Sequence, residues 1–260
     1  EALYLTADDG TGALAGYRED EFFGASLTGD TFGRYVTSTG EKHFVRLASP
    51  TQGTANDDPL VPDVVISEIM YNPPEEPVEG HEYIELFNRT GADVPLYDPA
   101  NPDNTFQFTD GIDFTFPTGA YVPAGGYALV VDVEPAVFRA AYNIPAAIPV
   151  YGPYTLDLGN DGERVTLSAP GQPEYSNPPP GEEPGYVPYV IYETVDYNDR
   201  LPWPTRADGE GASLERIDPA DYSDDPANWQ PSTFNGSPAA ANTGMDTTPD
   251  DAMFLRILVE

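Results

Sequence analysis

Proline recurs about every nine residues along this 260-residue chain, and this spacing restricts the fold more than any other feature. The 29 prolines are accompanied by 24 glycines, so few stretches are long enough for an extended helix. Between these breaks lie short aromatic and β-branched stretches, which are typical of strands joined by tight turns. Hydrophobic residues make up 40% of the chain, which argues against disorder. The sequence therefore predicts an all-β fold, a sandwich or a barrel.

Short apolar or alternating stretches mark the expected strands. They lie at 3–6, 43–47, 64–71, 82–88, 106–108, 112–116, 127–133, 155–158, 163–168, 187–197 and 213–217. Gly159–Gly162 predicts a hairpin between the strands at 155–158 and 163–168. The continuous apolar stretch 127–133 predicts a strand that is buried on both faces.

One helix is expected, over Glu134–Tyr142, with Pro135 in its first turn. The stretch from Pro170 to Pro188 is rich in proline, glycine and glutamate. It predicts a long surface loop rather than a linker between domains.

An internal repeat organises the chain. Leu3–Ala7 matches Val165–Ala169, and Gly29–Tyr35 matches Gly211–Ile217. Each copy then has an aromatic residue and closes in Ala-Asn, with 12 residues from aromatic to Asn in one copy and 13 in the other. These aromatic and asparagine residues are Phe44, Asn56, Trp229 and Asn242.

The two copies are unequal, because the second has about a hundred residues ahead of its matching blocks and the first has almost none. We therefore expect residues 1–57 to be the C-terminal half of a β domain and 58–63 to be a linker. Residues 64–242 are expected to form one complete sandwich, and 243–260 a second linker with an orphan strand at 252–260. This organisation is typical of a processed product or of a piece of a tandem array.

The charge of the chain excludes several partners. It carries 44 acidic and 11 basic residues, a net charge of −33, which repels phosphate backbones, so we expect no nucleic-acid partner. With one lysine there is no polybasic patch, and no apolar run is long enough for a membrane helix, so no membrane insertion is expected. The absence of cysteine removes disulfides, thiolate metal sites and thiol catalysis.

Two neighbouring motifs, Val65–Pro73 and Glu82–Asn88, resemble the opening strands of the lamin tail domain family, whose bacterial members read I-x-E-I-M-Y-N-P and E-[WY]-I-E-L-x-N. The family's closing motif, T-P-G-x-x-N, is altered at one or two positions in Thr51–Asn56 and in Ser237–Asn242. The likeness covers nearly all of 64–242, and its half-copy covers 3–56. Further matching motifs are Leu96, Phe116-Pro117, Val122–Tyr127, Gly159–Glu163, Val165, Leu167, Trp203-Pro204, Asp208-Gly209 and Ser213–Arg216.

The resemblance implies an immunoglobulin-like β-sandwich found in secreted or surface proteins of bacteria. In such proteins the module occurs in tandem, or beside nucleases, phosphatases and spore-coat-type kinases. It also implies a binding or structural role, with no catalytic residues to carry over. No heptad rod is present, so the likeness is to the tail module alone.

Few residues point to catalysis. The sequence contains two histidines, His43 and His81, and lacks the G-x-S-x-G, His-Glu-x-x-His, Walker and dinucleotide glycine motifs. A glycosidase-like pair among the 44 carboxylates stays open, because the separation of its two carboxyl groups does not follow from a sequence. We expect a protein that is not an enzyme.

Glu68 and Glu85 each lie inside an apolar strand. Strand alternation places Glu68 on the face of Ile66 and Met70, and a buried carboxylate must be paired or coordinated. The favoured interpretation is structural: a hydrogen bond to a loop backbone, or a pair with an arginine such as Arg216. The alternative is a calcium ligand.

Calcium is the one cofactor that the composition suggests. Acidic loops and linkers can bind Ca²⁺ through carboxylate oxygens, although no EF-hand spacing is present. The other interpretation, solvated acidic loops in a very acidic chain, is favoured. The candidate ligands are Asp57, Asp58, Asp103, Asp110, Asp113, Asp157, Asp161 and Glu163.

Aromatic residues gather between 170 and 225 and offer a binding surface for sugars or proteins. Core packing explains Trp203 and Trp229 more simply. The tyrosines are the candidate binding residues: Tyr186, Tyr189, Tyr192, Tyr197 and Tyr222.

These observations favour an extracellular, non-enzymatic structural or adhesive module. Its expected partners are copies of itself or neighbouring sandwich domains, joined by strand addition at the incomplete half. The alternative is a carbohydrate- or protein-binding accessory module of a larger secreted enzyme.

Overall fold

A computed structural model describes residues 2–74, 80–176 and 178–244. Regular structure in this part of the chain is almost entirely β, so the predicted all-β class is confirmed. The exceptions are α1 (Pro135–Tyr142), where the helix was expected, and the 3-10 turns η1 (Thr205–Ala207) and η2 (Pro226–Asn228). The orphan strand expected at 252–260 lies outside the described residues.

Two sheets of residues 64–231 face each other as a sandwich. The larger sheet has the order β14-β13-β6-β5-β17-β18, and the smaller has the order β11-β10-β15-β16. All neighbours are antiparallel except β13 and β14. The larger sheet consists of β5 (Val64–Met70), β6 (Tyr83–Asn88), β13 (Tyr127–Val131), β14 (Val150–Tyr151), β17 (Leu214–Arg216) and β18 (Trp229–Pro231). The smaller sheet consists of β10 (Gln107–Asp110), β11 (Phe114–Thr115), β15 (Gly162–Pro170) and β16 (Tyr189–Asn198).

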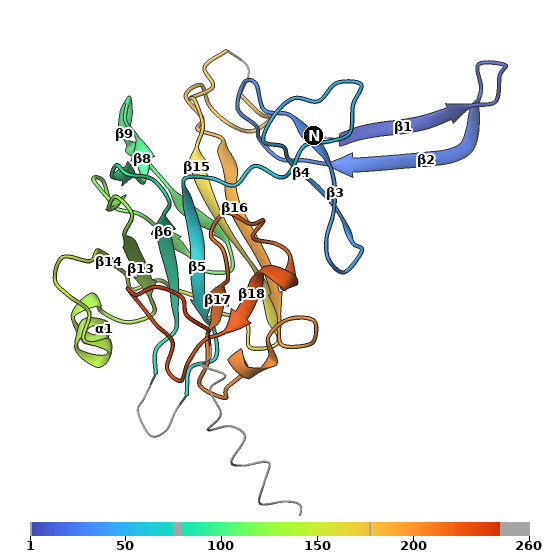
Figure 1. The fold of residues 1–260 in the computed structure, drawn as a ribbon. Coiled ribbons are helices and arrows are strands. Elements are labelled where there is room, and N and C mark those ends of the chain that lie inside the picture. Colours follow the sequence, from blue (N-terminus) through green and yellow to red (C-terminus); the bar gives the residue numbers. More distant parts are fainter. Residues whose placement is uncertain (1, 75–79, 177, 245–260) are drawn as a thin grey trace, which may run out of the picture.

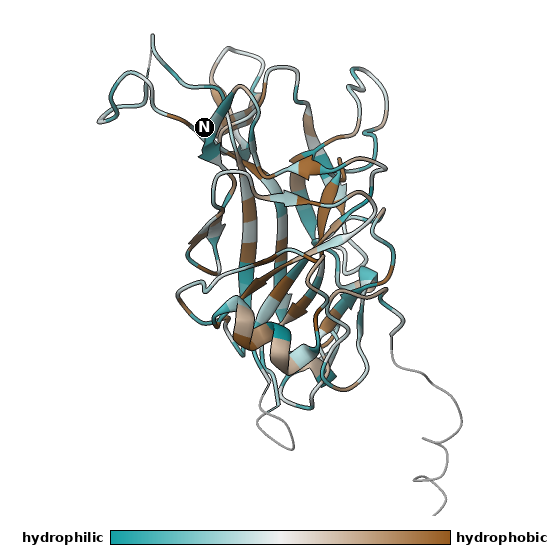
Figure 2. Ribbon diagram, turned by 90° about the vertical axis from the view of Figure 1, so that its left-hand side faces the viewer, coloured by the Kyte–Doolittle hydropathy of each residue, from teal (hydrophilic) through white to brown (hydrophobic). Residues whose placement is uncertain are grey.

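The main core lies between the two sheets. Ile66 and Leu86 from the larger sheet pack with Val165, Leu167 and Val195 from the smaller one, and all five are fully buried. Figure 2 shows hydrophobic residues along these strands, and they remove a large apolar area from water. Two short pairs lie at the margin of the sandwich: β7 (Val94–Pro95) with β12 (Tyr121–Val122), and β8 (Tyr97–Asp98) with β9 (Asn101–Thr105).

A second core covers the outer face of the larger sheet. Leu129 and Val131 of β13 pack there against Phe138 of α1, while Ala128 and Val130 belong to the main core. β13 is therefore buried on both faces, as its continuous apolar sequence predicts.

The N-terminal region forms two hairpins outside the sandwich. β1 (Ala2–Asp8) pairs with β2 (Leu14–Phe22), and β3 (Phe32–Val36) pairs with β4 (Lys42–Arg46). Figure 1 shows the β1–β2 hairpin projecting away from the rest of the molecule. The predicted loop between Pro170 and Pro188 is confirmed, since β15 ends at Pro170 and β16 starts at Tyr189.

The segment expected to be a linker, 58–63, is hydrogen-bonded on both sides. Leu60 N–H donates to the carbonyl of Arg46 at 2.8 Å, and Arg89 Nη1 donates to the carbonyls of Val61 and Pro62 at 3.1 and 3.0 Å. These bonds tie β4 to the end of β6 through the segment.

Strand alternation gave a wrong face for Ile66. The register between β5 and β6 shifts between Ile66 and Glu68, which makes Ser67 the extra residue of a β-bulge. Ile66 consequently packs in the main core, while Met70 packs in the second core on the opposite face. The bulge turns Glu68 away from Ile66.

The hairpin predicted around Gly159–Gly162 is also wrong, because both edges of β15 are occupied by β10 and β16. Residues 155–158 form a single bridge, between Thr155 and Asp113. Leu158 is held instead by its N–H, which donates to Glu82 Oε2 at 2.9 Å.

Within the described ranges, the helices are all too short or too polar to cross a membrane.

Candidate interaction site

The half-copy (1–57) repeats the strand pairing of the closing part of the complete copy (64–242). Arg34 lies opposite Phe44 in β3–β4, and Arg216 lies opposite Trp229 in β17–β18, as the sequence repeat aligns them. The β1–β2 hairpin corresponds in the same way to β15–β16. The sequence repeat is therefore a structural repeat of two antiparallel hairpins.

Further strands extend both hairpins in the complete copy but not in the half-copy. β10 pairs with the outer edge of β15, and β5 pairs with the outer edge of β17. Among the described residues, β1 pairs only with β2, and β3 only with β4. The half-copy thus has two unpaired edges at the places that β10 and β5 occupy in the complete copy.

One ion pair occurs in both copies. Arg216 Nη1 lies 2.6 Å from Glu193 Oε1, and Arg34 Nη2 lies 2.7 Å from Glu19 Oε2. The two glutamates are equivalent, because each lies opposite the aligned leucine of the neighbouring strand. The side chains of Arg216 and Glu193 are 0% and 1% exposed, whereas those of Arg34 and Glu19 are 35% and 36% exposed.

Strand β5 contributes to this difference in burial. The N–H of Ile66 donates to Glu193, and the carbonyl of Ile66 accepts from Arg216 Nη1 at 3.2 Å. Burial raises the pKa of Glu193, and the Arg216 guanidinium opposes that rise. The backbone N–H and carbonyl of Ile66 therefore bind the two members of the ion pair.

The closing asparagines are equivalent in the same sense. Asn56 Nδ2 donates to the carbonyl of Arg34 at 2.9 Å, and Asn242 Nδ2 donates to that of Arg216 at 3.1 Å. Asn242 also donates to the carbonyl of Ser67, on β5, at 2.7 Å. The contact that Asn242 makes and Asn56 does not is again a contact with β5.

Apolar residues of the first hairpin are exposed where their counterparts are buried. Leu3 and Leu5 are 56% and 61% exposed, whereas the aligned Val165 and Leu167 are 0% exposed. Phe22, at the end of β2, is also exposed. Leu3 and Leu5 are thus exposed beside their partners Glu21 and Glu19, whereas Val165 and Leu167 of the complete copy are covered by the opposite sheet.

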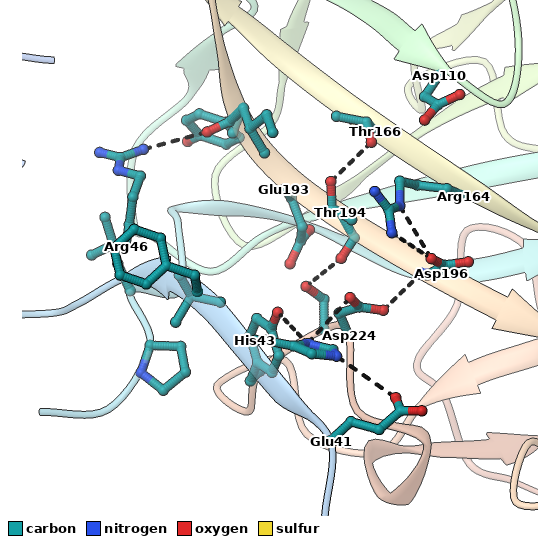
Figure 3. A pocket seen from close by; sticks show the side chains of 18 of the residues that line it. Glu41, His43, Arg46, Asp110, Arg164, Thr166, Glu193, Thr194, Asp196 and Asp224 are labelled. Carbon is teal, nitrogen blue, oxygen red and sulfur yellow. Dashed lines mark hydrogen bonds and ion pairs between the residues drawn. The ribbon is translucent and has the colours of Figure 1, made fainter. Parts of the chain in front are cut away.

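A cleft of about 850 Å³ lies between the half-copy and the smaller sheet. Arg46 and Asp30 of the half-copy form an ion pair of 2.8 Å, and Arg164 and Asp196 of the smaller sheet form one of 2.6 Å. Figure 3 shows Arg46, Arg164 and Asp196 around the cleft with His43 and Asp224. The cleft is polar and charged on both sides, which suits a hydrated polar ligand.

His43 bridges the two copies at this cleft. Its Nδ1 lies 3.1 Å from Tyr222 Oη and 3.4 Å from Asp224 Oδ2, and its Nε2 lies 3.8 Å from Glu41 Oε2. Burial raises the pKa of Asp224, and His43 opposes that rise. A Ser-His-Asp triad needs a serine at the second ring nitrogen, and here that nitrogen faces a carboxylate.

Three glutamates form a row across the larger sheet. Glu85 of β6 lies opposite Glu68 of β5, which lies opposite Glu215 of β17, and all three are buried. The closing segment (236–244) covers the row and supplies backbone donors: Ser237 N–H to Glu68 at 2.9 Å, Ala239 N–H to Glu85 at 2.6 Å and Gly244 N–H to Glu215 at 2.7 Å.

Side-chain hydroxyl groups complete the shell of this row. Tyr83 donates to Glu68 Oε1 at 2.6 Å, Ser213 donates to the same oxygen, and Ser67 donates to Glu85 Oε1 at 2.7 Å. Arg216, offered from the sequence as a partner for Glu68 and Glu85, pairs with Glu193 instead.

Burial raises the pKa of Glu68 to about 7, with the hydroxyl and amide donors opposing the rise. Burial also raises the pKa of Glu85 well above its ordinary value, and the Glu68 carboxylate adds to the increase. The Glu68 and Glu85 side chains therefore retain protons at pH values where exposed glutamates are ionised.

The calcium candidates lie in several separate segments. Within the described residues, no group of three or more His, Asp or Glu side chains is arranged to hold a metal ion. Asp57 accepts from Ser49 at 2.5 Å, which lowers the pKa of Asp57, and Glu163 accepts from the N–H of Gly159 at 2.9 Å. Calcium binding stays a prediction. By segment, the candidates are Asp57 and Asp58 after the half-copy, Asp103 on β9, Asp110 and Asp113 around the β10–β11 turn, and Asp157, Asp161 and Glu163 near the start of β15.

The candidate tyrosines do not form one cluster. Tyr192 and Tyr222 line the cleft. Tyr197 is buried, its hydroxyl donating to the carbonyl of Gly159, and Tyr189 donates to the carbonyl of Thr105. Tyr186 lies in the loop that precedes β16, where it bridges Glu174.

The two tryptophans lie in the main core. Their ring centroids are 6.1 Å apart, and Trp229 Nε1 donates to the carbonyl of Ser223 at 2.7 Å, so its polar atom is satisfied.

Sequence reasoning missed Glu19, Glu193 and Glu215 of the candidate site, and the hydrogen bond of Asn56. The repeat aligned Arg34 with Arg216, but the loop inserted between β15 and β16 hides the equivalence of Glu19 and Glu193. Aligning the strand that follows each Leu-x-Leu or Val-x-Leu block would have revealed it.

Comparisons of the chain with models of protein families, with curated protein sequences and with solved structures found no match.

Proposed function

We propose that this protein is a non-enzymatic structural module that joins like β-sandwich units into an assembly on a bacterial cell surface or in a secreted fibre. In this proposal the module is an immunoglobulin-like sandwich of the lamin tail type, and the half-copy is completed by strands of a neighbouring unit. The observation that carries the proposal is the pair of unpaired edges on β1 and β3, at the places where the complete copy has β10 and β5.

Energetics support the addition of further strands to the half-copy. A two-stranded hairpin is marginally stable by itself in water, and an unpaired strand edge is a template for another strand. Leu3 and Leu5 are more than half exposed, and covering both would contribute about 3 kcal/mol. The half-copy thus gains stability from a partner that adds strands to it.

The solution mass of the chain tests the proposal. Light scattering after size exclusion is expected to show species heavier than the 28.1 kDa chain, with a mass that increases with protein concentration. Leu5→Lys is expected to shift the mass to that of the monomer, because it replaces an exposed apolar side chain with a charged one. Ile217→Lys, at a half-exposed position of the complete copy, is the matched control. A monomer at all concentrations would overturn the assembly role.

The cleft supports a second candidate, a carbohydrate-binding accessory module of a larger secreted enzyme. Its charged side chains, among them Arg46, Arg164 and Asp196, offer hydrogen bonds to a sugar. Calorimetric titration with soluble oligosaccharides distinguishes the two, since saturable binding that Arg164→Ala abolishes favours the accessory module.

A further inference from the structure

The closing segment (236–244) is attached to the larger sheet mainly through carboxyl groups. The N–H groups of Ser237, Ala239 and Gly244 each donate to a different glutamate of the row, at 2.9, 2.6 and 2.7 Å. Asn242 adds bonds to two backbone carbonyls. The segment itself contains no charged side chain. Its attachment therefore depends on the protonation of three neighbouring carboxyl groups.

Members of the row repel each other when they are ionised, because they lie directly opposite one another on adjacent strands. No arginine, lysine or histidine of the described residues forms an ion pair with any of them. Protonation of one carboxyl group relieves the repulsion. The titratable groups that interact electrostatically with Glu68 are Glu85 and Tyr83 from β6, Glu215 from β17, Tyr127 from β13 and Tyr142 from α1.

The hydroxyl group of Ser237 shows where a proton is needed. Its oxygen lies 2.5 Å from Glu215 Oε1 and 3.4 Å from Glu68 Oε2. A hydroxyl carries one hydrogen, so it donates to one of these oxygens and presents a lone pair to the other. When Glu68 Oε2 carries a proton, it donates to Ser237 while Ser237 donates to Glu215, and every oxygen of this chain is bonded. When that proton is lost, a carboxylate oxygen faces a lone pair.

We propose that the closing segment is a proton-dependent latch, docked on the larger sheet while Glu68 carries a proton and released when Glu68 is ionised. Release brings the row into contact with water and uncovers the margin of the second core, where Ala239 packs. The latch goes beyond the assembly role, because it lies in the complete copy and uses no residue of the half-copy.

The pKa of Glu68 sets the direction of the response. Burial raises it to about 7 in the docked state, from the ordinary value of 4.5 that applies in water. The docked state therefore binds the proton more tightly, so docking is strongest below pH 4.5 and weakens as pH increases from about 4.5 to 7. Burial also raises the pKa of Glu85 well above its ordinary value, which acts in the same direction. The latch is closed in acid and is released most easily at and above pH 7.

Gly236 places the segment directly on the row. A Cβ atom at this position would lie 2.8 Å from Glu68 Oε1 and would also clash with the hydroxyl of Tyr83. The backbone of Gly236 has a φ of +72°, which a residue with a side chain rarely adopts. Gly236→Ala is therefore expected to release the segment at every pH, while the sheet beneath it remains folded.

Hydrogen exchange of the full chain, followed by mass spectrometry at pH 5 and pH 7.5, tests the latch. Each rate is divided by the intrinsic exchange rate at that pH, which gives the opening equilibrium of 236–244. In the native chain, opening is expected to be at least about tenfold greater at pH 7.5. Glu68→Gln, whose amide keeps a donor and an acceptor, is expected to reduce this increase by a factor of at least about three. Glu210→Gln, at an exposed position, is the matched control and is expected to respond like the native chain.

Gly236→Ala gives the reference for a released segment. It is expected to remove the protection of 236–244 at both pH values, while amides of β5 and β6 stay protected. Loss of protection throughout the larger sheet in this variant would overturn the proposal, because the segment would then be an integral part of the sandwich. Equal opening of the native chain at both pH values, or the same increase in Glu68→Gln, would also overturn it, whether or not light scattering shows assembly.

Discussion

The three buried glutamates of the larger sheet have no arginine partner among the described residues. The hydrogen bonds that they accept explain how the fold accommodates them. Glu68 Oε1 alone accepts from Tyr83, from Ser213 and from the N–H of Ser237. Ser237 Oγ also donates to Glu215 at 2.5 Å, which links two members of the row. Hydrogen bonds offset part of the cost of burying a carboxylate, and protonation offsets more of it.

The raised pKa of Glu68 makes stability depend on pH in a defined direction. Between about pH 4.5 and 7 the folded chain keeps this proton while the unfolded chain loses it, so the free energy of unfolding decreases as pH increases through that window. A pKa of about 7 corresponds to a loss of about 3 kcal/mol above pH 7.

Glu68→Gln imitates the protonated side chain and is expected to remove that part of the decrease. Urea unfolding of both proteins at pH 5 and pH 8 measures this effect. The free energy of unfolding is expected to fall more between the two pH values for the native chain than for Glu68→Gln. Glu210→Gln, at an exposed position, is the control. The same change with pH in native chain and Glu68→Gln would show that Glu68 is ionised throughout.

At the scale of elements, the two copies show how one hairpin pair behaves with and without covering strands. The equivalent hairpins share their register from Leu3 to Leu5 and from Val165 to Leu167. The centre of β15 is nevertheless buried, whereas β1 is exposed along nearly all of its length. The local sequence forms the hairpin in each case, and neighbouring strands decide how stable it is.

Hydrogen exchange is expected to separate the two hairpins. In the monomeric chain, amides of β1–β2 should exchange at least about a hundredfold faster than those of β5–β6, since local opening of an uncovered hairpin costs little. Mass spectrometry of the exchanged chain provides the measurement, with β15–β16 as the internal control. Equal protection of both hairpins would show that the first is stable by itself.

The sequence predicted elements with a strong apolar pattern and missed those without one. β5, β6 and β13 were predicted because their apolar residues are continuous or alternate. β2 was missed because GYRED, at its centre, has no apolar alternation, and its structure depends on pairing with β1. The bulge at Ser67 could not be predicted either, since it depends on how β5 pairs with β6.

The candidate site shows the same limit. The repeat in the sequence located the half-copy and aligned Arg34 with Arg216, so its outline was predictable. The row of Glu85, Glu68 and Glu215 was predicted only in part, because Glu215 joins it through the pairing of β17 with β5. Contacts between distant strands require the register, and the register follows from the whole fold.

At the scale of the molecule, two units meet across a polar junction. Ser38 N–H donates to Asp225 Oδ2 at 2.7 Å, and the rings of Tyr35 and Tyr222 are 5.3 Å apart. With the His43 bridge and the bonded segment 58–63, these contacts hold the half-copy against the sandwich, so its open edges have a fixed direction in space (Figure 1).

A net charge of −33 opposes any association between copies, so salt is expected to promote it. Raising NaCl from 10 to 150 mM shortens the Debye length from about 30 to about 8 Å, and the weight-average mass is expected to increase. Sedimentation velocity measures the change. Substituting CaCl₂ at constant ionic strength separates bound calcium from screening, and a mass that falls with added NaCl would indicate association through ion pairs.

The closing segment also determines how a string of such units would respond to tension. A pulling force enters the sandwich at β5 and leaves it at 236–244, and these two parts of the chain are joined directly by the bonds of Glu68 with Ser237 and of Asn242 with Ser67. The first and last segments of the unit are thus hydrogen-bonded to each other across β5. Pulling on the two ends must break these hydrogen bonds before it disrupts the core. The row of buried glutamates, which destabilises the unit in the absence of force, would then resist its unfolding under force.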